Sequence, residues 1–255
     1  MTIVLNEHEW AKDMINARSL GKKPFETLCR VSRYYLDKNY PKRDVRKMLD
    51  VFILQCDPTA SIPKWAGAAD RAVERALKPS AVCVDSIAVT KPEMKIIDSL
   101  NGRQLQRLAF TLLCLSKYWE LVNPNRDHWV NNRDTDIMRM ANINTSIKRQ
   151  SALYYKLNEA GLIQFSKKVD NTNVRVCFAK DGRPVLHISD FRNLGYQYLR
   201  YHGEPFFECR NCGITVKESD YKGGGRRRMY CKECASEIAV KQRVNSVMRK
   251  RNDKD

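Results

Sequence analysis

The sequence contains no run of eighteen consecutive apolar residues, so no segment is predicted to cross a membrane as a helix. Residues 1–9 (MTIVLNEHE) also lack the basic start and the long apolar run of a signal peptide. We therefore expect a reducing compartment, the cytoplasm or the nucleoid, and no membrane partner.

Motifs of the common enzyme classes are missing as well. The chain has no His-Glu-x-x-His motif and no phosphate loop ending in Gly-Lys-Ser or Gly-Lys-Thr. Its four histidines are dispersed, at His8, His128, His187 and His202. The neighbouring Asp127 and His128, with Asn131 and Asn132, resemble a nuclease site only faintly, and a polar loop explains them as well. We expect no enzymatic activity.

Acidic residues are scarce. The chain of 29.6 kDa has 29 Asp and Glu against 46 Lys and Arg, which gives a formal net charge of +17. A charge of this size causes self-repulsion unless an anion relieves it, and nucleic acid is the commonest such anion. Residues 206–255 are the most basic part of the chain for their length. An anionic lipid surface is the less favoured partner for this basic end.

Two cysteine pairs lie near the C-terminus, Cys209 with Cys212 and Cys231 with Cys234. The two residues inside each pair let both thiolates reach one ion, and the eighteen residues between the pairs are enough for a hairpin. Four protein ligands leave no open position for water, so the spacing predicts one structural zinc ion. Two disulfides or four free thiols are the alternatives, and a reducing compartment favours zinc.

Apolar periodicity divides the rest of the chain into two further parts. Residues 1–80 are predicted to form a helical domain, with three helices over 25–36, 45–56 and 65–76. Residues 81–205 form the second part, and residues 206–255 carry the cysteine pairs. The sequence therefore predicts an α-rich α+β fold in three domains.

Residues 81–205 show a specific order of elements. Ala81–Val84 is predicted to be a strand, Pro92 opens a helix, and a long buried helix continues through Trp119. Capping and turn residues then predict a short helix from Asp134, a turn at 142–144, a longer helix that ends at Gly161, and two strands over 162–169 and 174–178. A third strand over 185–188 and a connecting segment over 191–201 follow.

This order, with the junction Leu157-Asn-Glu-Ala-Gly-Leu-Ile-Gln-Phe165, resembles the winged-helix superfamily over residues 95–180. The resemblance implies a DNA-binding fold whose second helix enters the major groove. Candidate nucleic-acid contacts on that helix are Lys148, Arg149, Ser151 and Tyr155, and those on the wing are Lys167, Lys168 and Arg175. The alternative is a winged helix that packs against another protein.

The cysteine-containing segment resembles a zinc ribbon, because Gly213 follows the first pair and allows the chain to turn beneath the metal. Ala235 stands where the second pair of a ribbon would have glycine, and a basic tail helix is expected to start there instead. Candidate phosphate contacts at the glycine-rich hairpin tip and along the tail are Arg226, Arg227, Arg228, Lys241, Arg249, Lys250 and Arg251. A flexible charged tail without a ligand is the alternative.

These features favour a non-enzymatic nucleic-acid-binding protein with duplex DNA as its partner, acting in transcription or in replication initiation. The short linkers and helical front end resemble replication and regulatory proteins of phages and mobile elements, which would place the protein in a host cytoplasm or nucleoid. An adaptor or inhibitor that binds a protein or ribonucleoprotein complex is the alternative function. The sequence leaves the target sequence and the choice between DNA and RNA open.

Overall fold

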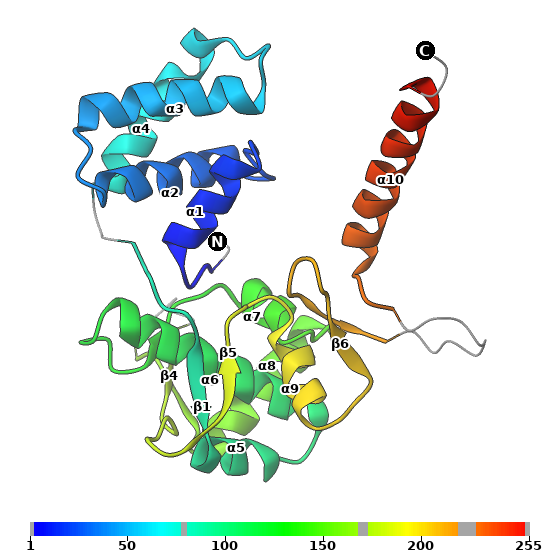
Figure 1. Cartoon of the computed structure of the whole chain (residues 1–255). Helices are drawn as coiled ribbons and strands as arrows, with labels where there is room; N and C mark the ends of the chain where they lie inside the picture. Colours follow the sequence, from blue (N-terminus) through cyan, green and yellow to red (C-terminus); the bar gives the residue numbers. More distant parts are fainter. Residues whose placement is uncertain (1–2, 78–80, 168–172, 219–227, 253–255) are drawn as a thin grey trace. The chain divides into compact units, whose positions relative to one another are not determined.

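A computed structural model describes residues 3–77, 81–167, 173–218 and 228–252 (Figure 1). The structure is mixed α and β, with helices prevailing, and it divides into two compact units, Met1–Ser86 and Ile87–Asp255. The sequence predicted a boundary at residue 80. The first unit extends further because the Val84 amide donates to the Leu5 carbonyl at 2.9 Å and the Glu7 amide donates to the Val82 carbonyl at 2.8 Å.

The first unit contains four helices in its described part: α1 (Glu7–Asn16), α2 (Pro24–Leu36), α3 (Lys42–Cys56) and α4 (Ile62–Ala76). Fully buried Leu28, Leu49 and Ile53 lie in its core. The three predicted helices correspond to α2, α3 and α4. Helix α1 was not predicted, and the strand predicted over Ala81–Val84 is reduced to one bridge between Asn6 and Cys83.

Helix α1 is stabilised by ion pairs as well as by apolar contacts. Apolar periodicity in the sequence therefore did not predict it. Its buried Glu7 forms ion pairs with Arg33 and with Arg30, the latter at 3.4 Å between Nε and Oε1. The Arg30 guanidinium also lies 5.0 Å from the centre of the Trp10 ring. A buried carboxylate is tolerated here because two guanidiniums compensate it.

Two of the basic residues at the start of α3, Lys42 and Arg46, form ion pairs within the first unit. Lys42 pairs with Glu74, and Arg46 pairs with both Asp50 and Asp70. This pairing favours a solvated ionic surface over a phosphate-binding one at this place.

The second unit contains the remaining elements. Its helices are α5 (Lys91–Asp98), α6 (Arg103–Val122), α7 (Asp134–Met140), α8 (Ile147–Glu159), α9 (Leu194–Tyr201) and α10 (Lys232–Asn252). Its strands are β1 (Ile87–Thr90), β2 (Trp129–Val130), β3 (Ile163–Phe165), β4 (Val174–Val176), β5 (Pro184–Ile188), β6 (Phe206–Glu208) and β7 (Thr215–Lys217).

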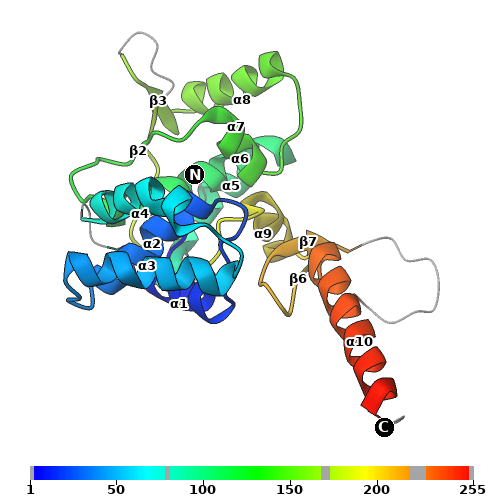
Figure 2. The same ribbon diagram turned by 90° about the horizontal axis from the view of Figure 1, so that it is seen from above.

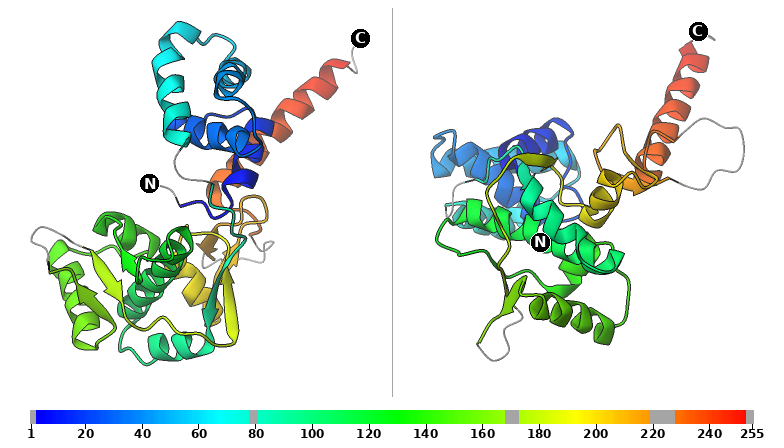
Figure 3. Two further views of the ribbon diagram at one scale, coloured as in Figure 1. Left: turned by 90° about the vertical axis from the view of Figure 1, so that its left-hand side faces the viewer. Right: turned by 90° about the horizontal axis from the view of Figure 1, so that it is seen from below.

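Helix α6 is the core of this unit, and α5, α7, α8 and α9 all contact it (Figure 3). Every residue from Leu108 to Ser116 is buried, so the middle of the helix is covered on all sides. A helix that is apolar on every face needs partners on every side, and the surrounding elements supply them.

Three strands form the sheet beside α8, in the order β2-β4-β3 (Figure 2). The predicted strands over 162–169 and 174–178 correspond to β3 and β4, each shorter than expected. Strand β2 was not predicted, because it has only two residues and lies in a polar stretch. Trp129 lies opposite Arg175, and Val130 lies opposite Val174.

Strand β5, the predicted third strand, pairs with β1 and not with the wing. A buried carboxylate supports this region. Glu93 in α5 is fully buried and accepts hydrogen bonds from the amides of Thr90 (2.8 Å) and Lys180 (2.9 Å) and from the Lys117 ammonium (2.7 Å). Glu93 therefore joins β1, α6 and the chain that follows β4.

The segment predicted as a connection over 191–201 contains helix α9. Its Tyr198 is fully buried and donates to Asp98 Oδ1 at 2.7 Å, so it is a core residue. Gly195 lies so close to α7 that a Cβ atom there would stand 2.0 Å from the Ala141 carbonyl oxygen. Only glycine allows α9 to approach this closely.

Candidate metal centre and nucleic-acid interface

The two cysteine pairs are positioned by different local structures. Cys209 and Cys212 lie in the turn between β6 and β7, where the Gly213 amide donates to the Cys209 carbonyl at 2.9 Å and Gly213 has a φ of +73°. Cys231 immediately precedes α10, and Cys234 lies in its first turn. The tail helix thus begins at Lys232, three residues before the predicted start, and the second pair is part of a helix end.

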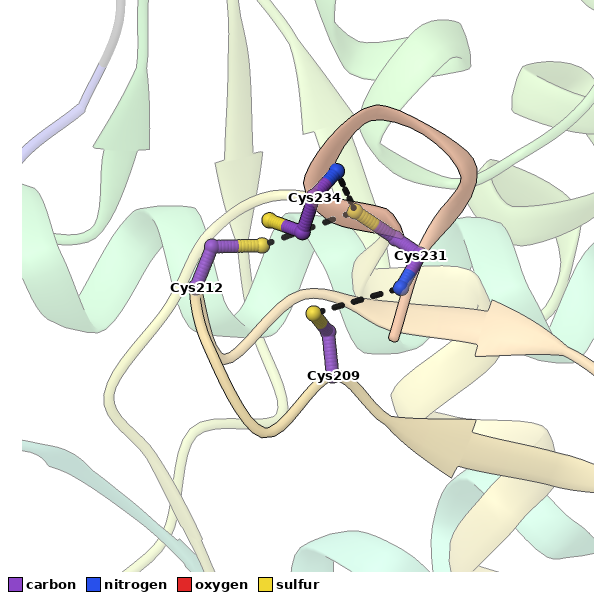
Figure 4. Close-up of side chains that lie close together, drawn as sticks. All are labelled: Cys209, Cys212, Cys231 and Cys234. Carbon is purple, nitrogen blue, oxygen red and sulfur yellow. Dashed lines mark hydrogen bonds between the residues drawn. The ribbon is translucent and has the colours of Figure 1, made fainter. Parts of the chain in front are cut away.

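The four sulfur atoms lie together, each within 4.8 Å of the others (Figure 4). The Sγ atoms of Cys212 and Cys231 are 3.8 Å apart, and none of the four cysteines forms a disulfide. Sulfur ligands about 2.3 Å from a tetrahedral zinc ion lie about 3.8 Å from one another. The geometry therefore fits a metal ion held by Cys209, Cys212, Cys231 and Cys234, and it does not fit two disulfides.

Hydrogen bonds from backbone amides lower the pKa of the Cys209 thiol, which favours metal binding. Burial alone would raise the pKa of Cys209, but hydrogen bonds from the amides of Cys231, Cys212 and Asn211 lower the pKa to about 6. The Cys231 amide donates to Cys209 Sγ at 3.2 Å (Figure 4). Burial raises the pKa of Cys212 to about 12. The backbone amides thus favour the thiolate form of Cys209, and thiols of the cluster that remain protonated must release their protons when a metal binds.

The metal centre is attached to the rest of the second unit through α9 and the residues before it. Arg192 Nη2 donates to the Cys212 carbonyl, and Asn193 Nδ2 donates to the Thr215 carbonyl at 2.9 Å. Arg200 pairs with Glu208 at 2.7 Å. These contacts hold the β6–β7 hairpin, and with it the first cysteine pair, against α9.

Helix α8 presents the predicted residues to solvent. Leu153 and Leu157 are buried, whereas Lys148, Arg149 and Tyr155 are exposed. Ser151 is also exposed, but its hydroxyl already donates to the Ile147 carbonyl at 3.1 Å. The two cations form no ion pair with another described residue.

A pocket of about 330 Å³ lies between α8 and the start of α6. Arg149 and Lys156 line it from α8, and Arg103 lines it from α6, whereas none of the residues that line it is acidic. Arg103 is partly neutralised by Glu204, at 3.2 Å. Lys156 was not predicted as a contact. Its spacing of seven residues from Arg149, two helical turns, was the available signal.

The β3–β4 hairpin, which the sequence predicted to be a wing, carries the next three candidate residues. Lys167 is exposed, and Lys168 lies outside the described residues. Arg175 is placed on β4, where its Nη2 pairs with Asp127 Oδ1 at 2.6 Å and its Nε donates to the Asp127 carbonyl. Arg175 thus joins β4 to the loop before β2, and its contact with nucleic acid stays a prediction.

The basic residues near the metal centre are described only in part. Arg226 and Arg227 lie outside the described residues, whereas Arg228 is exposed and lines a pocket of about 570 Å³ with Arg210, Phe207 and others. Lys241 is exposed on α10. Arg249, Lys250 and Arg251 belong to the same helix, and their side chains are not described.

Two large apolar side chains are also exposed on α8: Ile147, which was not predicted as a contact, and Tyr155, which was. Ile147, the first residue of α8, has 81% of its surface exposed, and Tyr155 has 61% exposed. The Tyr155 ring packs against Phe165 of β3, with 5.4 Å between ring centres. The exposed side of α8 is thus both cationic and apolar.

Comparison with known proteins yields no matching family model, curated protein or solved structure. In the described residues, no helix combines the length and apolar character needed to cross a membrane. Function must therefore be argued from the site itself.

Proposed function

We propose that this chain is a non-enzymatic nucleic-acid-binding protein that places α8 in the major groove of duplex DNA. The order of α6, α7, α8, β3 and β4 supports this proposal, because the winged-helix resemblance rests on the same order of long helix, short helix, longer helix and hairpin. In helix-turn-helix proteins the second helix of the motif reads base edges, and its N-terminal residues do most of the reading. Lys148 and Arg149 occupy this place on α8.

The observation that carries the proposal is a set of exposed cations on α8 that form no ion pair with a described acidic residue. Lys148, Arg149 and Lys156 have no acidic partner among the described residues, in contrast to the paired cations of α3. Cations left unpaired in this way are available for phosphate or for the guanine acceptors. The net charge of +17 adds attraction for any nucleic acid.

The metal centre has a structural role in this proposal. Zinc is the metal that four cysteine thiolates favour, and four protein ligands leave no position for a substrate. The ion would hold the β6–β7 hairpin and the start of α10 together. The cations at Arg228 and Lys241 would then contact the backbone beside the α8 site. We place the protein in transcriptional control or replication initiation, as the resemblance to phage and mobile-element regulators implies.

Binding of the zinc-loaded protein to duplex DNA, single-stranded DNA and RNA across a salt series tests the proposal. A steep salt slope and a preferred duplex would support it, and Lys148→Ala with Arg149→Ala should reduce that preference. Lys95→Ala is the matched control, because Lys95 is an exposed helical lysine outside this surface. Equal, weak binding to every nucleic acid would exclude the proposal.

A second function is favoured by the apolar residues of the same surface. Ile147, Tyr155 and Phe165 would suit an adaptor or inhibitor that docks on a protein or ribonucleoprotein complex. Ile147→Ser separates the two functions, because it removes apolar area without removing charge. If nucleic-acid binding is absent in the wild type, and a partner complex is lost on Ile147→Ser, the second function is the correct one.

A further inference from the structure

Helix α10 is long and has almost no support from the rest of the chain. It spans 21 residues, and within the described residues only its beginning is buried, at the metal centre. Every described side chain from Val240 onward is exposed, with 55% of Val240 and 53% of Val244 accessible. No other described element packs along this part of the helix.

Such a helix needs stabilisation from outside its own sequence. Forming the first turn is the unfavourable step, and helices without tertiary packing are marginal in water at lengths of about 12–15 residues even when alanine-rich. Residues 240–247 of α10 include Val240, Val244, Asn245, Ser246 and Val247, all of lower helix propensity than alanine. The helical state of α10 therefore depends on stabilising contacts at its N-terminal and C-terminal halves.

The metal centre supplies the first turn. Cys231 and Cys234 bracket the start of α10, and the Ala235 amide already donates to the Cys231 carbonyl at 2.9 Å. The Cys234 amide also points at Cys231 Sγ, at 3.4 Å (Figure 4). A zinc ion with four thiolates has a net charge of about −2, which is favourable at the positive N-terminal end of a helix. Metal binding would thus remove the nucleation cost of α10.

The opposite half of α10 is suited to a polyanion. From Lys241 to Asn252 the sequence has five basic residues and no acidic one: Lys241, Arg243, Arg249, Lys250 and Arg251. These charges repel one another in the free protein. Phosphates of a duplex would neutralise them, and the major groove is wide enough to admit a helix. The charge pattern therefore selects nucleic acid as the occupant of this surface.

We propose that metal at the four cysteines stabilises α10 as a nucleic-acid-binding arm, and that duplex phosphates further stabilise the basic half of this helix. This inference rests on the proposed function and adds its dependence on the metal. Loss of the metal would then weaken nucleic-acid binding through α10, while α8 and the rest of the second unit stay folded.

Hydrogen–deuterium exchange of the full-length protein tests this coupling, because it reports on each segment separately. The protein is compared with a chelator, with zinc, and with zinc plus a 20-base-pair duplex. Zinc should slow exchange of the amides in 233–240 at least tenfold, and the duplex should extend this protection through 241–252. The amides of α6 should remain protected in all three states.

The triple variant Arg249→Gln, Lys250→Gln, Arg251→Gln isolates the basic half, because glutamine keeps the helix propensity and removes the charge. It should keep the zinc-dependent protection of 233–240 and lack the duplex-dependent protection of 241–252. Its salt slope should flatten by about one for each phosphate that the variant no longer neutralises. The control Lys12→Gln, Lys47→Gln, Lys64→Gln makes the same charge change in the first unit, at three exposed lysines, and should show neither effect.

The outcomes distinguish this inference from the proposed function. Exchange of α10 that is equal with and without zinc would overturn the coupling. Tight duplex binding that leaves 241–252 unprotected would overturn the arm and leave the α8 proposal standing. If no nucleic acid binds at all, the arm and the proposed function both fail.

Discussion

The side-chain amide of Asn142 donates a 2.9 Å hydrogen bond to the side-chain oxygen of Asn193, which ties the turn between α7 and α8 to the start of α9. Asn193 passes the connection on, since its own amide donates to the Thr215 carbonyl of the metal-centre hairpin at 2.9 Å. Both asparagines have positive φ, 55° and 53°. A continuous set of hydrogen bonds thus joins the turn that precedes α8 to the cysteine-bearing hairpin.

Replacing Asn193 with Asp should weaken this connection. The carboxylate keeps the size and tolerates the positive φ, but it cannot donate to Thr215 and places two oxygens against each other. We expect a decrease of about 1–3 kcal/mol in the free energy of unfolding, measured by denaturant titration of the zinc-loaded protein. Asn39→Asp, at an exposed residue that also has positive φ, should cost far less. Equal decreases in the free energy of unfolding for the two variants would show that the hydrogen bonds of Asn193 to Asn142 and Thr215 add no particular stability.

Replacing Cys212 with Ser should abolish stoichiometric zinc binding. We expect one zinc ion per wild-type chain and a much weaker site in the variant, because serine is a poor zinc ligand and the site is left with three thiolates. Metal content after dialysis, read with a colorimetric chelator, gives the result. Cys177→Ser changes an exposed cysteine outside the cluster and should retain the ion. Full zinc content in the Cys212 variant would refute the assignment of the ligands.

Replacing Lys117 with Met should be strongly destabilising, because it leaves the fully buried Glu93 carboxylate without its cation. Removing one member of a buried ion pair costs about 3–5 kcal/mol, which thermal or denaturant unfolding would detect. The exposed Lys95 in α5 provides the matched change, Lys95→Met, which should be nearly neutral. The additional change Glu93→Gln removes the charge and keeps an acceptor for a backbone amide, so a double variant no more stable than Lys117→Met would show that the unpaired charge is not the cause.

Replacing Gly195 with Ala should separate α9 from α7. The new Cβ atom would meet the Ala141 carbonyl oxygen at 2.0 Å, so the backbone must move, at a cost of about 1–3 kcal/mol. Gly67→Ala in α4 meets nothing closer than 3.6 Å and should stabilise its helix by about 0.5–1 kcal/mol. A lower melting temperature than the wild type for Gly195→Ala, with a higher one for Gly67→Ala, would confirm the close approach of α9 to α7. Higher melting temperatures for both variants would contradict it.

Replacing Lys156 with Gln should lower affinity for all duplex sequences alike and leave sequence preference unchanged. Lys156 lines the pocket beside Arg149 and Arg103, where it is suited to contact a phosphate and not a base edge. The salt slope of duplex binding should fall by about one. Lys95→Gln carries the same change on α5, and its salt slope should equal that of the wild type. A change in sequence preference would place Lys156 in the groove instead.

The helices that the sequence predicted are those with a clear apolar stripe. Val45, Leu49 and Phe52 mark α3, and Leu108 and Leu112 mark α6, and all five are buried in the structure. The elements that escaped prediction obtain their support elsewhere. Helix α1 depends on the buried ion pairs of Glu7, and β2 depends on pairing with a strand more than forty residues away. Both interactions join residues that are far apart in the sequence, so a short window of sequence cannot predict them.

Some features of the candidate site could likewise be predicted from the sequence, and others could not. The cysteine cluster was predictable because metal ligation fixes both residue type and spacing, and the structure brings all four sulfurs together. The role of Arg175 was not, because its partner Asp127 lies 48 residues earlier in the chain. Exposure of Lys148 and Arg149 followed from the buried side of α8, whereas the pocket that joins Arg149 to Lys156 requires the position of α6.

The pairing of β1 with β5 has a mechanical consequence. Ile87 and Ile188 are direct partners, so the chain enters from the first unit and leaves towards α9 at the same end of an antiparallel ribbon. Tension applied between the first unit and the metal centre would pull these two strands apart from that end, one hydrogen bond after another. When the strands are separated from one end, the force acts on one inter-strand hydrogen bond at a time. A force along the strands would act on all of these hydrogen bonds together. Ile87 and Ile188, both nearly inaccessible to solvent, are therefore the first pair to resist any force that passes through the molecule.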